Sequence, residues 1–244
     1  MHLLALCAPE PHTSSLPQKI RWLSIGADHP LQELAMAADA NAVQVFQKYP
    51  LDFMKQTLVR APSCQTAVYG RPMALTLSLD PMATAQLAGK AVKVYALRAA
   101  EPGEPSFSSY ICDFSTGNIS YQVLGRESEF CFTFAMDGCT FSVGSPTGTG
   151  DVLVSHGNAK GVTEGGDSQV GRQHSFASQL HGGGVAQMLQ PGTYRADGAK
   201  VATTFGLRDR TGWSFYYQNY VVTKKGFPPG YELFGVYDFS GKKV

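Results

Sequence analysis

The sequence carries little charge, and it lacks the signals that would direct a protein to nucleic acid or into a membrane. Charged residues make up only 16% of the 244 residues, the net charge is +1, and no long basic run is present to attract phosphate groups. No stretch reaches the roughly 18–20 apolar residues of a membrane span. The apolar start MHLLALC has no basic region before it and is too short for a secretory signal. We therefore expect no nucleic-acid partner, no membrane span and synthesis in the cytosol.

Cysteines are few and scattered, and no two of them form a C-x-x-C pair. That absence excludes a zinc knuckle and a thioredoxin-type redox motif. An odd number of dispersed cysteines, in a chain without a secretory signal, indicates reduced thiols. We expect neither a metal nor another cofactor. The five cysteines are Cys7, Cys64, Cys112, Cys131 and Cys139.

Glycine and proline are plentiful, and most of the chain alternates between apolar and polar residues. Helical spacing and capping residues predict helices at 31–48, 52–60 and 82–89. Alternation predicts strands at 92–97, 109–114, 118–124, 129–136, 140–143, 152–156, 193–194, 201–208, 214–223 and 232–239. Residues 161–192 are Gly-rich and show no pattern, which is typical of a functional or mobile loop.

Many strands separated by turns indicate a β-sandwich or a barrel, with helices added from the first third of the chain. We expect an α+β protein with a β-sandwich core flanked by helices. Residues 1–90 would form a partly helical segment packed on that core, and residues 91–244 would form the β-sandwich domain. A single domain over 1–244 is the alternative.

The run FTFAMDGCTFSVG, residues 132–144, places Cys139 directly after Gly138 and between two strand-like segments. A Gly-rich loop, 144–150, leads to the next strand, so the two strands predict a hairpin. With the strands paired symmetrically about this loop, Cys139 faces His156, and their Cβ atoms are about 4.5–5.5 Å apart. The alternation of side chains puts both residues on the same face.

A thiol and an imidazole at this distance can perform nucleophilic catalysis. A free thiol is mostly protonated at neutral pH, and a neighbouring imidazole removes its proton. The base needs a third group to orient it. Backbone N–H groups of Gly138 and Cys139 can stabilise an oxyanion, because a glycine lets the backbone approach a substrate closely.

The segment from Phe132 to Cys139 resembles the nucleophile segment of the cytotoxic necrotizing factor superfamily of glutamine deamidases, and most closely its Burkholderia lethal factor branch. In that superfamily a Gly-Cys turn follows a strand, and a histidine lies on the next strand. In the lethal-factor and CheD-type members, a threonine six residues before the cysteine completes the triad. Thr133 and His156 stand at the positions of that threonine and histidine. The resemblance covers about residues 130–157, and Asp137 replaces the serine that usually precedes Gly-Cys.

The resemblance implies a deamidase fold and a bacterial toxin or effector that converts a glutamine of a host protein to glutamate. Cys139 would attack the carboxamide, His156 would activate the thiol and protonate the leaving ammonia, and Thr133 would orient His156. The host target would be a Rho-type GTPase or a translation-initiation helicase. The protein would be a monomer, leave the bacterial cytosol by a signal-free route and act in the host cytosol.

Other interpretations stay open. A transglutaminase or a cysteine peptidase would use the same Cys-His pair, and a non-enzymatic β-sandwich binding module would keep Cys139 as a core residue. A zinc site made of Cys131, Cys139 and His156 lacks a recognisable fourth ligand. The sequence HGGG at 181–184 is similar to a lipase oxyanion motif, but no G-x-S-x-G elbow accompanies it. Residues expected to line the cleft are Cys131, Asp137, Tyr194 and Trp213.

Overall fold

A computed structural model describes residues 37–60, 69–159, 169–195, 198–225 and 228–244. Its helices are α1 (Ala40–Lys48), α2 (Pro50–Gln56), α3 (Gln169–Leu180) and α4 (Pro191–Tyr194). Its strands are β1 (Leu58–Arg60), β2 (Met73–Leu79), β3 (Thr84–Leu87), β4 (Lys90–Val92), β5 (Val94–Ala99), β6 (Phe107–Cys112), β7 (Ile119–Leu124), β8 (Phe130–Thr133), β9 (Thr140–Gly144), β10 (Val152–Gly157), β11 (Val185–Leu189), β12 (Val201–Asp209), β13 (Gly212–Lys224) and β14 (Gly230–Asp238). The protein is thus mostly sheet with few helices, which confirms the α+β, sheet-rich class.

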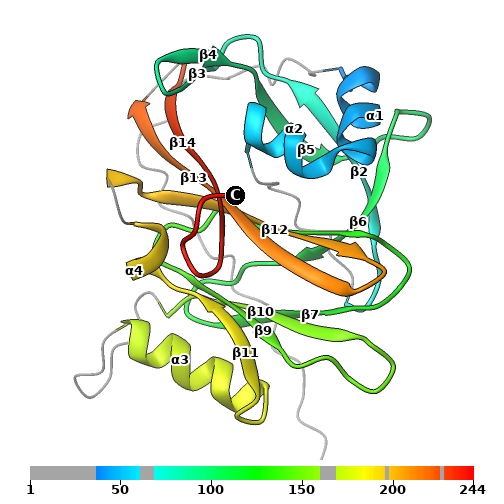
Figure 1. Ribbon diagram of the computed structural model, residues 1–244, viewed down its shortest axis with the longest axis vertical. Coiled ribbons are helices and arrows are strands. Elements are labelled where there is room, and N and C mark those ends of the chain that lie inside the picture. Colours follow the sequence, from blue (N-terminus) through cyan, green and yellow to red (C-terminus); the bar gives the residue numbers. More distant parts are fainter. Residues whose placement is uncertain (1–36, 61–68, 160–168, 196–197, 226–227) are drawn as a thin grey trace, which may run out of the picture. The chain divides into compact units, whose positions relative to one another are not determined.

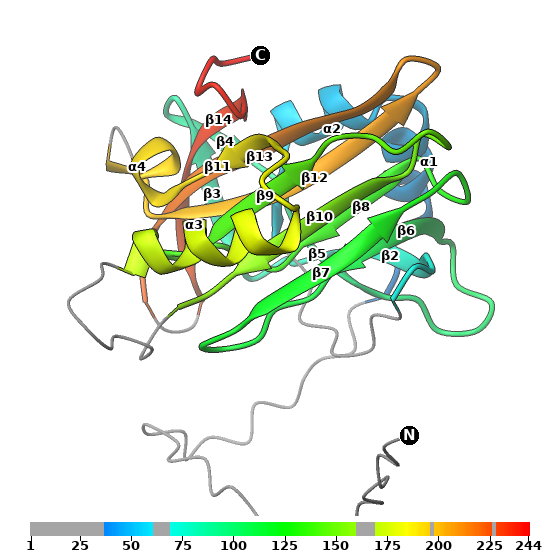
Figure 2. The same cartoon turned by 90° about the horizontal axis from the view of Figure 1, so that it is seen from below.

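Two sheets contain the strands of the described part of the chain. The larger, mixed sheet has the order β1-β5-β2-β6-β8-β12-β13-β14-β3-β4, and the smaller, antiparallel sheet has the order β11-β9-β10-β7. The sheets pack face to face, as shown by the rings of Phe141 on β9 and Phe215 on β13, whose centroids are 6.0 Å apart. Figures 1 and 2 show the small sheet lying between the large sheet and α3.

The helices cover the outer faces of the two sheets. Asp39 caps α1 by accepting the N–H of Ala42 at 2.9 Å, and Phe46 of α1 packs its ring 4.7 Å from Phe107 and 4.9 Å from Phe130 on the large sheet. Pro50 starts α2, where a missing N–H is harmless. Among the helices described, none is long and apolar enough to cross a membrane.

The unit Ala35–Val244 is compact, and strands from both sides of residue 90 share its large sheet. Strand β5 pairs with β1 and β2, and β14 pairs with β3. In the described residues, strands that precede and follow residue 90 thus belong to one sheet. The expected N-terminal segment lies outside the described residues as far as residue 36.

Five sequence-based expectations of local structure are wrong in whole or in part. Residues 82–89 contain β3 instead of a helix: Asp80 accepts the N–H groups of Met82 and Ala83 as a helix cap would, but the chain then pairs with β14 and β4. The expected helix at 52–60 ends at Gln56 and is followed by β1. Residues 193–194 belong to α4, and the unpatterned stretch contains α3 and β11. The helix expected at 31–48 begins at Ala40, and its residues 31–36 lie outside the described part.

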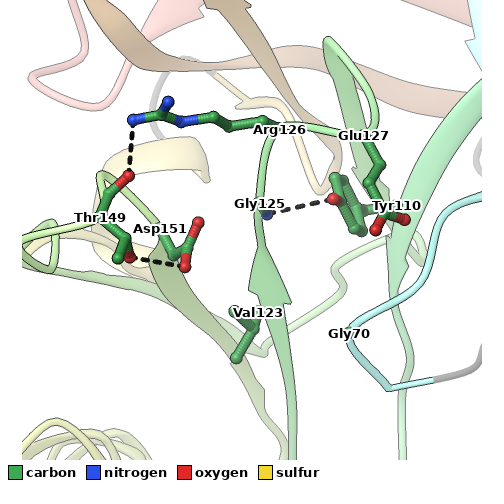
Figure 3. A pocket seen from close by; sticks show the side chains of 8 residues that line it. All are labelled: Gly70, Tyr110, Val123, Gly125, Arg126, Glu127, Thr149 and Asp151. Atoms are coloured by element: carbon green, nitrogen blue, oxygen red, sulfur yellow. Dashed lines mark hydrogen bonds between the residues drawn. The ribbon is translucent and has the colours of Figure 1, made fainter.

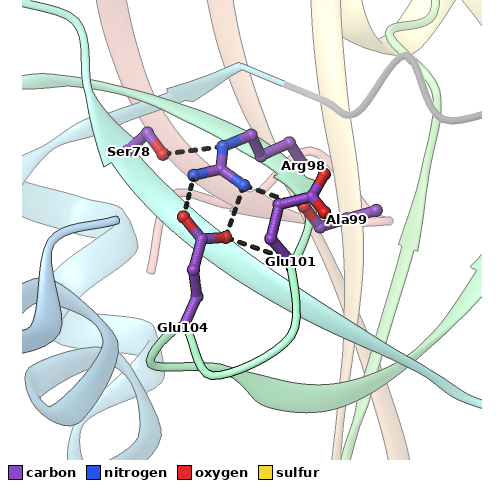
Figure 4. Close-up of polar contacts among 5 residues, drawn as sticks. All are labelled: Ser78, Arg98, Ala99, Glu101 and Glu104. Carbon is purple, nitrogen blue, oxygen red and sulfur yellow. Dashed lines mark hydrogen bonds and ion pairs between the residues drawn. The ribbon is translucent and has the colours of Figure 1, made fainter. Parts of the chain in front are cut away.

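One ion pair anchors the turn between β5 and β6. The guanidinium of Arg98 donates to both carboxylate oxygens of Glu104, at 2.7 and 2.6 Å, and to Ser78 at 3.0 Å (Figure 4). This bidentate geometry is the strong form of an Arg-carboxylate pair. The arginine holds the pKa of Glu104 at about 2.

Candidate active site

The turn that carries Cys139 connects the two sheets. Strand β8 of the large sheet ends at Thr133, the chain crosses, and Cys139 stands directly before β9 of the small sheet. Gly138 has a φ of +100°, a conformation that side-chain-bearing residues rarely adopt, so glycine is needed there. The Cys139 side chain points into the apolar layer between the sheets and the residue is 5% exposed.

Side chains from α3 and α4 hold this turn on both sides of Gly138. The N–H of Gly138 donates to the hydroxyl of Tyr194 at 2.7 Å, and that hydroxyl donates to the carbonyl of Cys139 at 3.0 Å. The carbonyl of Gly138 accepts from the amides of Gln169 and Gln173, both at 3.0 Å. Gln173 also accepts from the hydroxyl of Thr140 at 2.6 Å. The cysteine therefore sits on a turn whose backbone is fixed by side chains distant in sequence.

Thr133 and His156 meet between the sheets, as expected from the sequence. The Thr133 hydroxyl lies 2.7 Å from Nδ1 of His156 and donates its own proton to the carbonyl of Cys112 at 2.8 Å. A hydroxyl has one proton to give, so toward His156 it must accept. Nδ1 of His156 therefore carries the ring proton, and Nε2 presents a lone pair. Nε2 is buried and has no hydrogen-bond partner in the described part of the chain.

The expected register of the hairpin is wrong by two residues. His156 pairs with Phe141, and Val154 pairs with Val143, because the turn closes tightly at its tip, where the N–H of Gly150 donates to the carbonyl of Thr147. A shift of two residues keeps every side chain on its expected face. Cys139, which stands one residue before β9, is consequently not directly opposite His156, and its thiol forms no hydrogen bond with Nε2 of His156.

Burial keeps both groups neutral. Desolvation raises the pKa of the Cys139 thiol to about 11, against the opposing effect of the Asp137 backbone amide, and lowers the pKa of His156 to about 4. Transfer of the thiol proton to the imidazole is therefore strongly unfavourable in this closed state. The pair is therefore a thiol and a neutral imidazole rather than a thiolate-imidazolium ion pair.

Asp137 is paired with a cation at the surface. Its carboxylate accepts from Arg195 at 2.5 Å, with both side chains largely exposed. The two charges act on the Cys139 thiol in opposite directions: Asp137 raises its pKa and Arg195 lowers it. Arg195 thus offsets the effect of the Asp137 carboxylate on the thiol.

The remaining predicted residues have different surroundings. Cys131 is buried in the same apolar cluster as Cys139, where burial raises the pKa of its thiol. Tyr194 is fully buried and clamps the turn. Trp213 packs between Tyr110 and Phe215, with centroids 6.2 Å from each. The described residues include no cluster of three metal-ligating side chains that could hold an ion.

Sequence reasoning missed three contributors to this site. Gln169 and Gln173 lie in the stretch that showed no helical pattern, although their spacing of four places them on one helix face. The carbonyl of Cys112, which fixes the proton of Thr133, is a backbone group and leaves no signal in the sequence. Of the expected oxyanion donors, Gly138 already donates its N–H to Tyr194.

Neither a protein-family model nor a curated protein sequence matches the chain. The chemistry of the site is therefore argued from its geometry. An imidazole with a fixed tautomer, a free lone pair and a thiol on a neighbouring rigid turn can carry out proton transfer and nucleophilic attack.

Proposed function

We propose that this protein is a cysteine-dependent amide hydrolase that deamidates a glutamine side chain of a target protein. The observation that carries the proposal is the hydrogen bond between Thr133 and Nδ1 of His156, which leaves Nε2 as a free base in the layer that also contains Cys139. The Nδ1–H of any buried histidine needs an acceptor, so the unpaired Nε2 is the feature that distinguishes His156 from a histidine kept only for packing. The sheet-rich α+β fold is compatible with the deamidase fold implied by the sequence.

Each residue has a defined part in the reaction. Sγ of Cys139 attacks the carboxamide carbon while Nε2 of His156 takes the thiol proton. His156 returns that proton to the leaving nitrogen, so that ammonia departs and a thioester remains. Water, deprotonated by the same nitrogen, then attacks the thioester and releases glutamate and the thiol. Because proton transfer accompanies attack, no free thiolate-imidazolium pair has to form in the closed site.

The target and setting follow from the resemblance at residues 130–157. On this proposal the protein is a bacterial toxin or effector whose substrate is a host protein, either a Rho-type GTPase or a translation-initiation helicase. It acts as a monomer in the host cytosol. A glutamine that becomes glutamate gains a negative charge, which is enough to disable a hydrogen-bonded switch.

One observation favours a second candidate, a non-enzymatic binding module with a structural thiol: Cys139 and His156 are almost completely buried. The two functions differ in whether ammonia is formed. Host-cell extract is incubated with the wild type, with Cys139→Ser and with the matched control Cys131→Ser, whose thiol lies in the same cluster. We expect ammonia release by the wild type and the control only.

Two further readings separate the reaction class. Incorporation of dansylcadaverine in preference to ammonia release would identify a transglutaminase, and new peptide amino termini would identify a peptidase. Absence of all three products with the wild type, or equal activity in Cys139→Ser, would contradict the proposed function and favour the binding module.

A further inference from the structure

A pocket of about 270 Å³ lies next to the candidate active site, between the end of β6 and strand β7. Its walls include Tyr69, Asp113, Ser120 and Tyr121. The rings of Tyr69 and Tyr121 meet edge to face, 5.2 Å apart, and the two residues are 58% and 48% exposed. Two such exposed aromatic side chains in contact on a small surface are unusual for a side of the protein that binds nothing.

The pocket combines aromatic rings with a carboxylate that has no cation. Asp113 accepts the N–H of Phe114 at 2.7 Å, and among the described residues it forms no salt bridge. No lysine or arginine belongs to the lining. Tyrosine rings and a carboxylate together attract a cation, through the ring quadrupole and through direct charge pairing.

The backbone connects this pocket directly to the candidate catalytic residues. Ser120 pairs with His156 across β7 and β10, and neighbouring strands are about 4.8 Å apart. Asp113 follows Cys112, whose carbonyl holds Thr133. Phe114 follows Asp113 in the chain, its ring lies 5.6 Å from the His156 ring, and it is 38% exposed. The backbone of the pocket wall is therefore one strand spacing from that of the histidine.

We propose that this pocket binds a lysine or arginine side chain of the target protein that flanks the glutamine to be deamidated. The inference rests on the proposed function for its substrate. It names a specificity determinant, Asp113, that takes no part in the chemistry. The expected substrate is an extended segment with a basic residue within a few positions of its glutamine.

A second pocket supplies a matched control. It has a volume of about 560 Å³ and lies near the opposite end of β7, where Leu124 pairs with Val152 (Figure 3). It contains two carboxylates, Glu127 and Asp151, and one guanidinium, that of Arg126, which donates to the carbonyl of Thr149 at 2.8 Å. Asp151 thus has a cation in its pocket, which Asp113 does not, so Asp151→Asn tests for a general effect of lost negative charge.

The experiment measures binding separately from turnover. Two fluorescein-labelled peptides carry one glutamine in a Gly-Ala background, flanked at two positions on each side by lysine or by uncharged norleucine. Their affinities for the full chain with Cys139→Ala, alone and combined with Asp113→Asn or Asp151→Asn, are measured by fluorescence anisotropy. We expect the lysine peptide to bind about fivefold tighter than the norleucine peptide. Asp113→Asn abolishes this preference, and Asp151→Asn preserves it.

Several results would overturn the inference: equal affinities of the two peptides, no binding of either at millimolar concentration, or a preference that survives Asp113→Asn or disappears equally in Asp151→Asn. The proposed function fails separately. If the wild type releases no ammonia from either peptide or from host proteins while the lysine preference is present, the pocket proposal is supported and the proposed deamidase activity is contradicted. If ammonia is released without any lysine preference, the deamidase activity is supported and the pocket proposal is contradicted.

Discussion

The buried histidine makes the stability of the protein depend on pH in a way that can be calculated. His156 is fully buried, and desolvation lowers its pKa from the ordinary 6.5 to about 4. In the unfolded chain the imidazole takes up a proton as the pH falls through 6.5, whereas the folded protein stays unprotonated until about pH 4. The unfolded state therefore binds more protons in this window, and the free energy of unfolding falls as the pH falls. Between pH 7 and pH 4 the loss due to His156 is about 3 kcal/mol.

The assay is urea unfolding at several pH values between 7 and 4, for the wild type and for His156→Gln. Glutamine is close in size to histidine and does not titrate, so the other titrating groups cancel in the difference between the two proteins. The wild type is expected to lose about 3 kcal/mol more than the variant over this range. Parallel curves for the two proteins, or an NMR titration of His156 with a midpoint near 6.5, would refute the assignment of His156 as a buried neutral base.

Three further predictions concern the Thr133–His156 hydrogen bond, the turn at Gly138 and the Arg98–Glu104 ion pair. Thr133→Val removes the acceptor for His156 Nδ1, so we expect the free energy of unfolding to fall by about 1–3 kcal/mol. We also expect ¹⁵N NMR to show a mixture of imidazole tautomers, and a single retained tautomer would contradict the hydrogen-bond assignment. Gly138→Ala places a side chain at a φ of +100°, so we expect the free energy of unfolding in urea to fall by about 1–2 kcal/mol. Gly148→Ala, where an added Cβ meets open space, is the neutral control, and equal effects of the two substitutions would refute the role of backbone strain. Glu104, held by the bidentate Arg98, is expected to titrate at about pH 2 when followed by NMR. The stabilising effect of the ion pair is then present above the ordinary pKa of 4.5 and is lost as the pH falls toward 2. A midpoint near 4.5 would show that the pair in Figure 4 does not persist in solution.

The strands of the core could be predicted from the sequence because their alternation reflects burial on one face. Strands β8, β9 and β10 lie close to the predicted ranges, since apolar residues of one parity fill the layer between the sheets. Local capping signals were less reliable. Asp80 caps a turn whose continuation was decided by pairing with β14, which is contributed by residues almost 150 positions later. Helix α3 has few apolar residues and buries only Gln173 and Ala177, so its apolar periodicity is a weak signal in the sequence.

The candidate site could be predicted to the level of faces, but not to the level of distances. The alternation of side chains along the strands placed Cys139 and His156 in the same layer, and a two-residue error in register did not change that result. The register itself depended on how the loop closes, which the glycines alone left undetermined. Gln173 and Tyr194, which form hydrogen bonds with the backbone of Gly138, belong to helices that are distant from this turn in the sequence. No spacing in the sequence relates them to Gly138.

The most direct test of the central claim is the intact mass of host proteins after exposure to the purified chain. Conversion of one carboxamide to a carboxylic acid adds about one dalton, and tandem mass spectrometry locates it on a glutamine. We predict this gain with the wild type and with Cys131→Ser, and its absence with Cys139→Ser and with His156→Gln. A one-dalton gain that persists in Cys139→Ser, or no glutamine modified by the wild type in any host extract, would contradict the assignment of Cys139 as the nucleophile of a deamidase.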